Sequence, residues 1–348
     1  MVHDPTLPDR NSFPNLKDKV VVVVGGASGI GAALTTLLYT HGANVVLGDI
    51  NSGTGEALVK SLLKQKEQYR TAASSGTATF VFCDVCKYSD IYGLFRTALD
   101  KHHHVDHAVF CAGIVDSPGS PYFDMTLSVD AVGKDPGSTR TLEVNFLGAC
   151  AFARIALTFL RNNSTPMTLN LPSSNRNHRP DRSMTFLSSV TGFRDAPGMF
   201  LYQTSKQAIL GLMRAMRTTI FANGGIRVNA VCPGMTETPM TSATGLIELF
   251  KNRPEANTVI PSSTSTSTPP TPTPTSLPSH YQSSTAVAEH VATIMLMESL
   301  NGASIYVEEG KGWEFEVGMA REMPRWLGEE PTRLSDENLR FLESLGGP

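Results

Sequence analysis

Residues 20–31 read VVVVVGGASGIG, and this stretch decides the fold that we predict. Five consecutive valines are typical of a strand buried on both faces, and residues 32–39 have the apolar pattern of a helix. Between them, Gly25, Gly29 and Gly31 allow a sharp turn and a close approach to a pyrophosphate, whose charge the helix N-terminus would stabilise. The stretch predicts a strand, a phosphate-binding turn and a helix.

The alternation of strands and helices continues along the chain. Strands that alternate with helices form a parallel sheet covered on both faces, with ligands at the carboxyl ends of the strands. We therefore predict an α/β fold, a three-layer doubly wound parallel sheet (Rossmann fold), as a single domain with loop insertions. The further expected strands are 44–48, 79–82, 108–111, 184–187, 227–231 and 304–307, and the helices are 55–69, 91–99, 142–160, 202–221 and 287–298.

The 348 residues exceed what one such sheet requires. We expect residues 19–310 to form the nucleotide-binding domain, with an N-terminal arm at 1–18 and a C-terminal tail at 311–348. Residues 262–279 consist of Ser, Thr and Pro apart from Leu277, a composition that cannot form a packed core. The excess therefore lies in ends and insertions. Two further polar segments are expected to be loops, residues 117–140 and 162–183.

Composition and charge exclude several classes of protein. With 41% hydrophobic and 18% charged residues the chain is globular, and its net charge of −3 provides no basic field for nucleic acid. No apolar stretch approaches the ~20 residues that cross a bilayer, and the first residues lack a secretory pattern. Five cysteines are a sparse, odd set, typical of reduced thiols. We expect a cytoplasmic protein without nucleic-acid or membrane partners.

Asp49 stands at the end of the second expected strand, 18 residues beyond Gly31. A carboxylate there accepts hydrogen bonds from ribose hydroxyls and repels a 2′-phosphate, which predicts NAD in preference to NADP. Ser28 likewise offers no positive charge to a 2′-phosphate. The alternative is a tight turn followed by a surface aspartate.

Three further side chains suggest proton transfer to or from an alcohol. Tyr202 and Lys206 are four residues apart, on one face of a predicted helix. An ammonium beside a phenol favours the phenolate and lowers its pKa, so the tyrosine can serve as a general base or acid. Ser189, at the end of a predicted strand, can stabilise charge on the same substrate oxygen.

Together with Asn145, these motifs resemble a classical short-chain dehydrogenase/reductase, over about residues 19–310. The resemblance implies that Ser189 rather than Ser188 is catalytic. It also implies that Asn145 distorts its helix and holds a water in a proton relay to Lys206. A packing hydrogen bond is the alternative reading of Asn145. The C-terminal part further resembles fungal members, many of which act in secondary metabolism.

The resemblance also implies a set of cofactor contacts. Asp84 would bind the adenine ring, and residues 229–234 with Thr238 resemble the element that contacts the nicotinamide carboxamide. The full set is Gly25, Ser28, Gly29, Ile30, Gly31, Asp49, Asp84, Val85, Ala112, Gly113, Tyr202, Lys206, Pro233, Gly234, Thr236 and Thr238.

Two positions depart from the family pattern. Val24 replaces the usual threonine before the glycine turn, and Phe110 with Cys111 replaces the asparagine pair before Ala112 and Gly113. We expect apolar packing at these positions in place of hydrogen bonds.

Two clusters of metal-ligating residue types lack the spacing of a tetrahedral site, so we expect no metal. They are His102, His103, His104, Asp106 and His107, and Cys83 with Cys86.

Residues 235–282 occupy the place of the family's substrate lid. Leu246, Ile247, Leu249 and Phe250 within it offer an apolar surface, which favours a bulky, mostly apolar alcohol or ketone. The small residues of helix 142–160 either pack on the sheet or, as the resemblance implies, form a subunit interface of a homodimer or homotetramer.

The sequence thus predicts an NAD-dependent oxidoreductase that converts a secondary alcohol to a ketone, or the reverse. Two alternatives stay open. One is an NADP(H)-dependent ketoreductase of the same fold, and the other is a nucleotide-sensing protein that keeps the fold without turnover.

Overall fold

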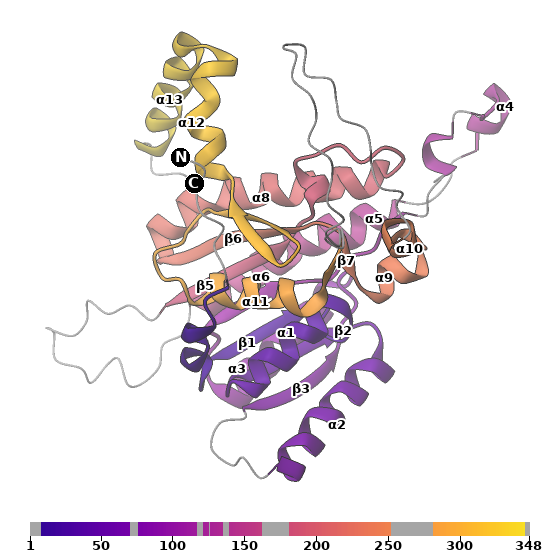
Figure 1. Cartoon of the computed structure of the whole chain (residues 1–348). Coiled ribbons are helices and arrows are strands. Elements are labelled where there is room, and N and C mark those ends of the chain that lie inside the picture. Colours follow the sequence, from indigo (N-terminus) through magenta and orange to yellow (C-terminus); the bar gives the residue numbers. More distant parts are fainter. Residues whose placement is uncertain are drawn as a thin grey trace, which may run out of the picture.

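The computed structural model describes residues 8–69, 76–116, 121–124, 126–134, 139–161, 181–251 and 281–344. The predicted Ser/Thr/Pro insert at 262–279 lies outside these residues, as does most of the predicted loop at 162–183. Most of the predicted loop at 117–140 is described and contains two short helices, η2 (Pro121–Phe123) and α4 (Val129–Val132). The described part is built on an eight-stranded sheet with helices on both faces (Figure 1). The strands are β1 (Val20–Val24), β2 (Asn44–Asp49), β3 (Thr77–Phe82), β4 (His107–Phe110), β5 (Arg182–Leu187), β6 (Ile226–Pro233), β9 (Ser304–Glu308) and β10 (Lys311–Glu314).

The strand order is β10-β9-β6-β5-β4-β1-β2-β3, and every pair is parallel except β9 with β10. The order reverses between β1 and β4, which opens a crevice beyond the carboxyl ends of these strands. This is the predicted doubly wound Rossmann fold. The longer helices are α1 (Gly29–Thr40), α2 (Ser52–Tyr69), α3 (Tyr88–His102), α6 (Gly148–Arg161), α8 (Phe200–Gly224) and α11 (Ser284–Leu296).

The valines of β1 show how the two faces of the sheet are filled. All five are completely buried, because successive side chains of a strand point to opposite faces. Val20, Val22 and Val24 belong to the core that packs against α3, α6 and α8. Val21 and Val23 belong to the second core, with α1 and α11. The run of apolar residues therefore reflects two cores rather than one.

Both ends of the predicted domain differ from the expectation. In the predicted arm, a 3₁₀ helix (Arg10–Leu16) buries Phe13 and Leu16 in the core beside α11. At the other end the sheet continues beyond Gly310, because Glu309 and Gly310 form a two-residue turn with φ of 49° and 73° that returns the chain as β10. The expected limit at residue 310 therefore falls inside a hairpin.

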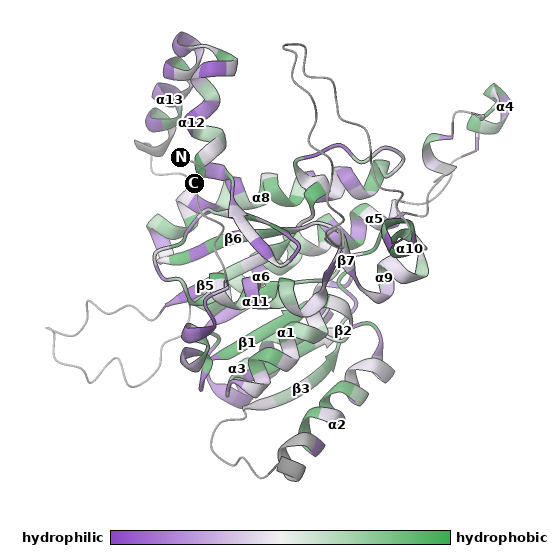
Figure 2. Cartoon of the chain, viewed as in Figure 1, coloured by the Kyte–Doolittle hydropathy of each residue, from purple (hydrophilic) through white to green (hydrophobic). Residues whose placement is uncertain are grey.

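Two amphipathic helices, α12 (Glu316–Leu327) and α13 (Glu329–Ser344), follow β10 and extend away from the sheet (Figures 1 and 2). They lie in the segment that the sequence predicted only as a tail. Several of their large apolar side chains are exposed, Trp326 (65%) and Phe341 (61%) among them.

The helix expected at 142–160 consists of three pieces. A short α5 (Arg140–Leu142) leads into a π-helical segment, η3 (Glu143–Leu147), and then into α6. Gly148, Ala149, Ala153 and Ala156 are buried, and α6 packs on β4 and β5, so these small residues serve packing on the sheet. Among described residues, Arg140–Arg161 is the one helix long and apolar enough to cross a bilayer, but 44% of its most apolar window is buried inside the fold.

Candidate active site

A cavity of about 830 Å³ opens at the carboxyl ends of the strands. Every residue of the predicted cofactor set lines it, and so does Ser189. Residues up to 213 positions apart in the chain, from Gly25 to Thr238, therefore meet at the place where a doubly wound sheet binds its ligand. Asn145 lies outside the lining and contacts it through a hydrogen bond from Ile114 N.

The glycine turn is shaped to bring backbone close to a ligand. Gly25 has φ of 78°, a value that side-chain-bearing residues rarely adopt, and a Cβ on Gly31 would overlap the carbonyl of Gly25. Ser28 occupies the N-cap position of α1 but its side chain makes no capping bond. The first N–H groups of α1 therefore suit the phosphates of a dinucleotide.

Asp49 joins the end of β2 to the glycine turn. One carboxylate oxygen accepts a hydrogen bond from Ala27 N (3.0 Å) and the other accepts one from Asn51 N (3.0 Å). These bonds fix the carboxylate at the wall of the cavity, where a ribose hydroxyl could donate to it.

Asp84 lies at the next strand end and accepts a hydrogen bond from Cys86 N (3.0 Å). Arg140, which the sequence analysis did not single out, also lines the cavity, 3.6 Å from the carboxylate of Asp84 and 3.6 Å from that of Glu143. The nearby guanidinium is thus shared between two carboxylates. Arg140 belongs to none of the motifs, so no sequence pattern marked it as part of the site.

The three predicted catalytic side chains lie together in the cavity. Lys206 Nζ is 5.6 Å from the centre of the Tyr202 ring and donates a hydrogen bond to the Leu187 carbonyl (3.0 Å). Ser189 Oγ accepts a hydrogen bond from Thr191 N (3.2 Å), and its side chain lies close enough to Tyr202 for hydrogen bonding to lower the pKa of the phenol. Serine and phenol hydroxyls can therefore meet one substrate oxygen.

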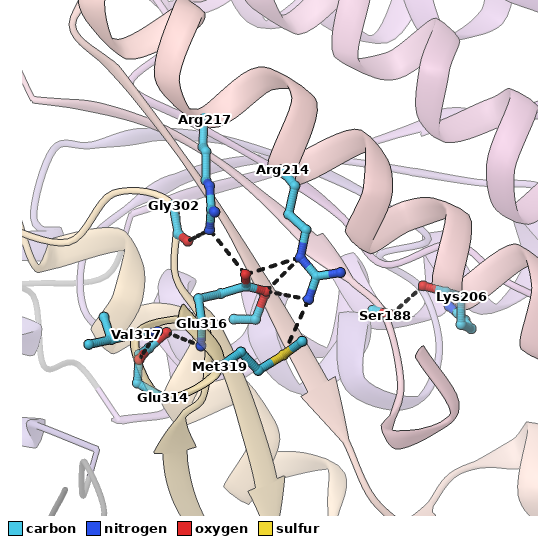
Figure 3. Close-up of polar contacts among 10 residues, drawn as sticks. Ser188, Lys206, Arg214, Arg217, Gly302, Glu314, Glu316, Val317 and Met319 are labelled. Carbon is cyan, nitrogen blue, oxygen red and sulfur yellow. Dashed lines mark hydrogen bonds and ion pairs between the residues drawn. The ribbon is translucent and has the colours of Figure 1, made fainter. Parts of the chain in front are cut away.

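The structure also separates the two adjacent serines. Ser188 donates its hydroxyl to the backbone carbonyl of Lys206 (2.8 Å), as Figure 3 shows. Its hydroxyl proton is therefore used to attach α8 to the end of β5. Both serines line the cavity, and the catalytic role of Ser189 stays a prediction.

The effect of burial on Tyr202 differs from the sequence-based expectation. Burial raises the pKa of Tyr202, and the hydrogen bond with Ser189 opposes this only in part. Burial also lowers the pKa of Lys206 to about 8. The lysine was expected to lower the pKa of the phenol, but burial disfavours the charged form of both groups and is the largest influence on each pKa.

Asn145 lies in the middle of the π-helical segment and is completely buried. Its carbonyl oxygen accepts from Ile114 N (2.8 Å), and its amide donates to Ile114 O (2.9 Å) and Ser205 Oγ (2.9 Å). The predicted helix distortion is present, and so is the packing role. A Cβ at Gly113 would lie 3.4 Å from both Lys206 Nζ and Asn145 Oδ1. The proton relay stays a prediction.

Apolar packing replaces the missing family asparagines, as expected. The Phe110 ring is buried 5.3 Å from that of Phe152, which also contacts Phe186. Cys111 lines the cavity, and burial raises the pKa of its thiol to about 12.

All five cysteines are free, and among the described residues no group of three or more His, Cys, Asp or Glu could hold a metal.

A family model described as short chain dehydrogenase matches residues 19–246, which include the glycine turn and all four predicted catalytic residues. The chain belongs to the short-chain dehydrogenase family. In this short-chain dehydrogenase the glycine turn, Ser189, Tyr202 and Lys206 line one cavity.

Individual relatives of this short-chain dehydrogenase include fungal proteins. A short-chain dehydrogenase/reductase of Penicillium roqueforti is 30% identical over 232 residues, which cover 66% of this chain and 58% of the relative. The 5′-hydroxyaverantin dehydrogenase of Dothistroma septosporum is 29% identical over 231 residues, 65% of this chain and 69% of the relative. The match thus spans well under two thirds of the Penicillium protein.

A solved structure supports the fold. The 3-ketoacyl-(acyl-carrier-protein) reductase from Brucella melitensis, complexed with NADH, superposes with a TM-score of 0.61 at 19% identity. The superposition covers 85% of this chain and 98% of the reductase.

The remaining wall of the cavity is mainly apolar. It includes the predicted Leu246 and Phe250 of α10 (Leu246–Lys251), next to α9 (Pro239–Ala243). Glu308, from β9, also lines it, accepts a hydrogen bond from the Tyr306 hydroxyl (2.9 Å) and approaches Gly234 so closely that a Cβ there would overlap the carboxylate. Sequence reasoning missed Glu308. The further apolar lining residues are Ile114, Val115, Val190, Met199, Met235 and Met240.

Proposed function

We propose that the protein is an NAD-dependent dehydrogenase/reductase that oxidises a secondary alcohol to a ketone, or catalyses the reverse. One observation carries the proposal: Ser189, Tyr202 and Lys206 line the same cavity as the glycine turn and Asp49. A binding module has no need of a phenol, a hydroxyl and an ammonium gathered beside a dinucleotide site.

The residues present fit a nicotinamide dinucleotide. Side chains at Gly25 and Gly31 would overlap neighbouring backbone, so only glycine lets the turn fold tightly and approach a pyrophosphate. The first turn of α1 has no side-chain cap, and its N–H groups can donate to the phosphates. The carboxylate of Asp49 suits unphosphorylated ribose, which supports NAD over NADP. When bound, the nicotinamide supplies the acceptor or donor of the hydride.

The protein's own groups handle the proton. In the oxidative direction Tyr202 takes the hydroxyl proton of the substrate, and in reduction it returns a proton to the developing alkoxide. Ser189 donates a hydrogen bond to the same oxygen and stabilises the charge that develops on it. Lys206, held by the Leu187 carbonyl, stabilises the phenolate whenever its amine is protonated.

The substrate that we propose is bulky and mostly apolar, as part of secondary metabolism. Support comes from the apolar side chains on the wall of the cavity, including those of α10, and from the similarity to a fungal 5′-hydroxyaverantin dehydrogenase. A pocket of this kind favours apolar bulk, with orientation set by a few polar groups such as Ser189 and Glu308.

The test is a turnover assay. Purified protein is incubated with NAD or NADP and a panel of hydrophobic secondary alcohols, and formation of reduced cofactor is followed, with Tyr202→Phe as the matched inactive control. We expect turnover with NAD that the control lacks. Turnover with NADP alone would favour the ketoreductase alternative. Binding of NAD without turnover across a broad panel would favour the sensor alternative.

We further propose a homodimer or homotetramer in the cytoplasm. The exposed apolar side chains of α12 and α13 and the five free cysteines support this proposal. Light scattering of the purified protein measures the oligomeric state, and a monomer at micromolar concentration would contradict it. Imaging of a fluorescent fusion tests the location.

A further inference from the structure

Helix α8 carries Tyr202 and Lys206 but lacks a local N-cap. It runs for 25 residues, its N-cap residue Met199 makes no side-chain capping bond, and its first turn contains no acidic residue. The first helical bond of this turn is made by Gln203 N to Met199 O (2.8 Å). The N–H of Tyr202 comes before that bond and needs another acceptor.

Asp116 supplies this acceptor from 86 residues earlier in the chain. One of its carboxylate oxygens accepts a hydrogen bond from Tyr202 N (2.9 Å). The other accepts a hydrogen bond from the hydroxyl of Thr141, which is buried on α5. The negative charge of Asp116 also lies at the positive end of the α8 dipole.

The segment that carries Asp116 is itself fixed. Two residues earlier, both backbone groups of Ile114 are bonded to the side chain of Asn145 (2.8 and 2.9 Å). The half-buried carboxylate is therefore held from two sides, by Asn145 through the backbone and by Thr141 directly. It connects the end of β4, α5 and the first turn of α8.

We propose that Asp116 is a positioning residue for the acid/base Tyr202. It does not line the cavity, so it acts through α8, by fixing the turn from which the phenol extends toward Ser189. This inference rests on the proposed function, because it assigns a partner to the tyrosine of that same site.

The chain contains a matched control. Asp124 likewise accepts one backbone N–H and one threonine hydroxyl, but both belong to Thr126, two residues away (2.8 and 2.7 Å). Its contacts are local and exposed. Asp124→Ala therefore removes the same types of hydrogen bond, none of them made to α8, and keeps the neighbouring Phe123 ring that packs on Phe200 at the start of α8 (5.1 Å between ring centres).

The test compares Asp116→Ala, Asp116→Asn and Asp124→Ala with the unmodified protein. For Asp116→Ala we expect kcat to fall about tenfold, with the KM of the alcohol and the Kd of NADH changed by less than about twofold, because small misplacement of a reacting group costs rate rather than affinity. Asp116→Asn keeps an oxygen that can accept from Tyr202 N and should regain most of the lost rate. Hydrogen exchange of residues 199–206 should quicken in Asp116→Ala alone.

Three outcomes would overturn the proposal. They are a kcat of Asp116→Ala equal to that of Asp124→Ala, an Asp116→Asn protein as slow as Asp116→Ala, and unchanged hydrogen exchange at the start of α8. If Asp116→Ala fails to fold, Thr141→Val removes the other contact of the carboxylate, and an unchanged kcat there overturns the proposal too. If the unmodified protein turns over no alcohol, the proposed function fails. The hydrogen-exchange measurement still tests separately whether Asp116 fixes the first turn of α8.

Discussion

At the scale of single residues, burial dominates the chemistry of this site. The pKa of Tyr202 is raised and that of Lys206 is lowered to about 8, in both cases chiefly because burial disfavours the charged form. The raised pKa keeps the phenol of Tyr202 protonated near neutral pH, as the proton donor in reduction must be, whereas a pKa of about 8 lets Lys206 exchange its proton close to neutral pH.

Replacing Tyr202 by Phe tests the acid/base assignment. We expect kcat to fall by about a thousandfold, because general acid–base catalysis is lost while the ring and its packing stay. The affinity for NADH, measured by fluorescence titration, should stay nearly unchanged. Normal turnover in the variant would remove Tyr202 from this role.

Replacing Asp49 tests cofactor choice. Asp49→Ala should lower the preference for NAD over NADP by about tenfold or more, because a charged hydrogen-bond acceptor and its repulsion of a 2′-phosphate are lost. Asp49→Asn removes the negative charge but keeps an oxygen that can accept the hydrogen bond from Ala27 N. It therefore distinguishes the effect of the charge on cofactor preference from an effect on the shape of the glycine turn. The measurement is kcat/KM with each cofactor, and an unchanged ratio would contradict the assignment.

His107 gives the protein a pH-dependent stability. It is completely buried, bonded through Nδ1 to Ser183 Oγ (2.9 Å), and burial lowers its pKa to about 4. The unfolded chain binds a proton near pH 6.5, so this contribution is present above that pH and is lost as the pH falls through 4, by about 3 kcal/mol. Denaturant unfolding from pH 7 to pH 4 should show this loss, and His107→Asn should show a correspondingly smaller one. An equal loss of unfolding free energy between pH 7 and pH 4 in the two proteins would contradict this role of His107.

At the scale of elements, distortions place the functional side chains. The π-helical segment puts Asn145 between the loop after β4 and α8, and the uncapped α1 leaves its N–H groups for a ligand. A regular helix at either point would fill its own hydrogen bonds and serve the site less well.

The hairpin between β9 and β10 contains a strained residue. Glu309 has φ of 49° and precedes Gly310 in a two-residue turn whose favoured sequence is Asn-Gly. Glu309→Asn should raise the free energy of unfolding by about 0.5 kcal/mol, since asparagine tolerates the left-handed region better. Gly310→Ala, with φ of 73° at that site, should lower it. Denaturant unfolding measures the free energy of unfolding of both variants. A Glu309→Asn protein less stable than the unmodified protein would contradict this explanation of the turn.

At the scale of the whole molecule, partly buried ion pairs join distant segments. Glu316, at the start of α12, accepts hydrogen bonds from Arg214 (2.8 Å) and Arg217 (3.1 Å) on α8 and from Ser304 on β9 (2.8 Å), as Figure 3 shows for the arginines. The C-terminal helices are thereby attached to the helix that carries Tyr202.

Removing the charge of Glu316 should loosen this attachment. Its side chain is only 9% exposed, so Glu316→Gln should cost about 2–3 kcal/mol of stability by leaving two arginines underpaired. Glu322→Gln, which breaks an exposed pair with Arg325 on the same helix, is the control and should cost little. Thermal unfolding measures both, and equal losses would contradict the burial argument.

Much of the fold followed from local pattern. Alternating strands and helices predicted the doubly wound sheet, because a buried strand and an amphipathic helix leave strong periodic signals. β10, α12 and α13 were missed. β10 is a short edge strand formed by a hairpin turn with Glu309, which is no typical turn residue, and the helices follow it in a segment taken as a tail.

The sequence alone determined which residues are chemically able to act: the glycine turn, Asp49, Ser189, Tyr202 and Lys206, since each belongs to a motif of short range. Only the tertiary structure decided their surroundings. It placed Ser188 on the carbonyl of Lys206, Arg140 and Glu308 at the cavity, and Asp116 at the start of α8. Such contacts join residues far apart in the chain, and their strength depends on burial, which no local pattern encodes.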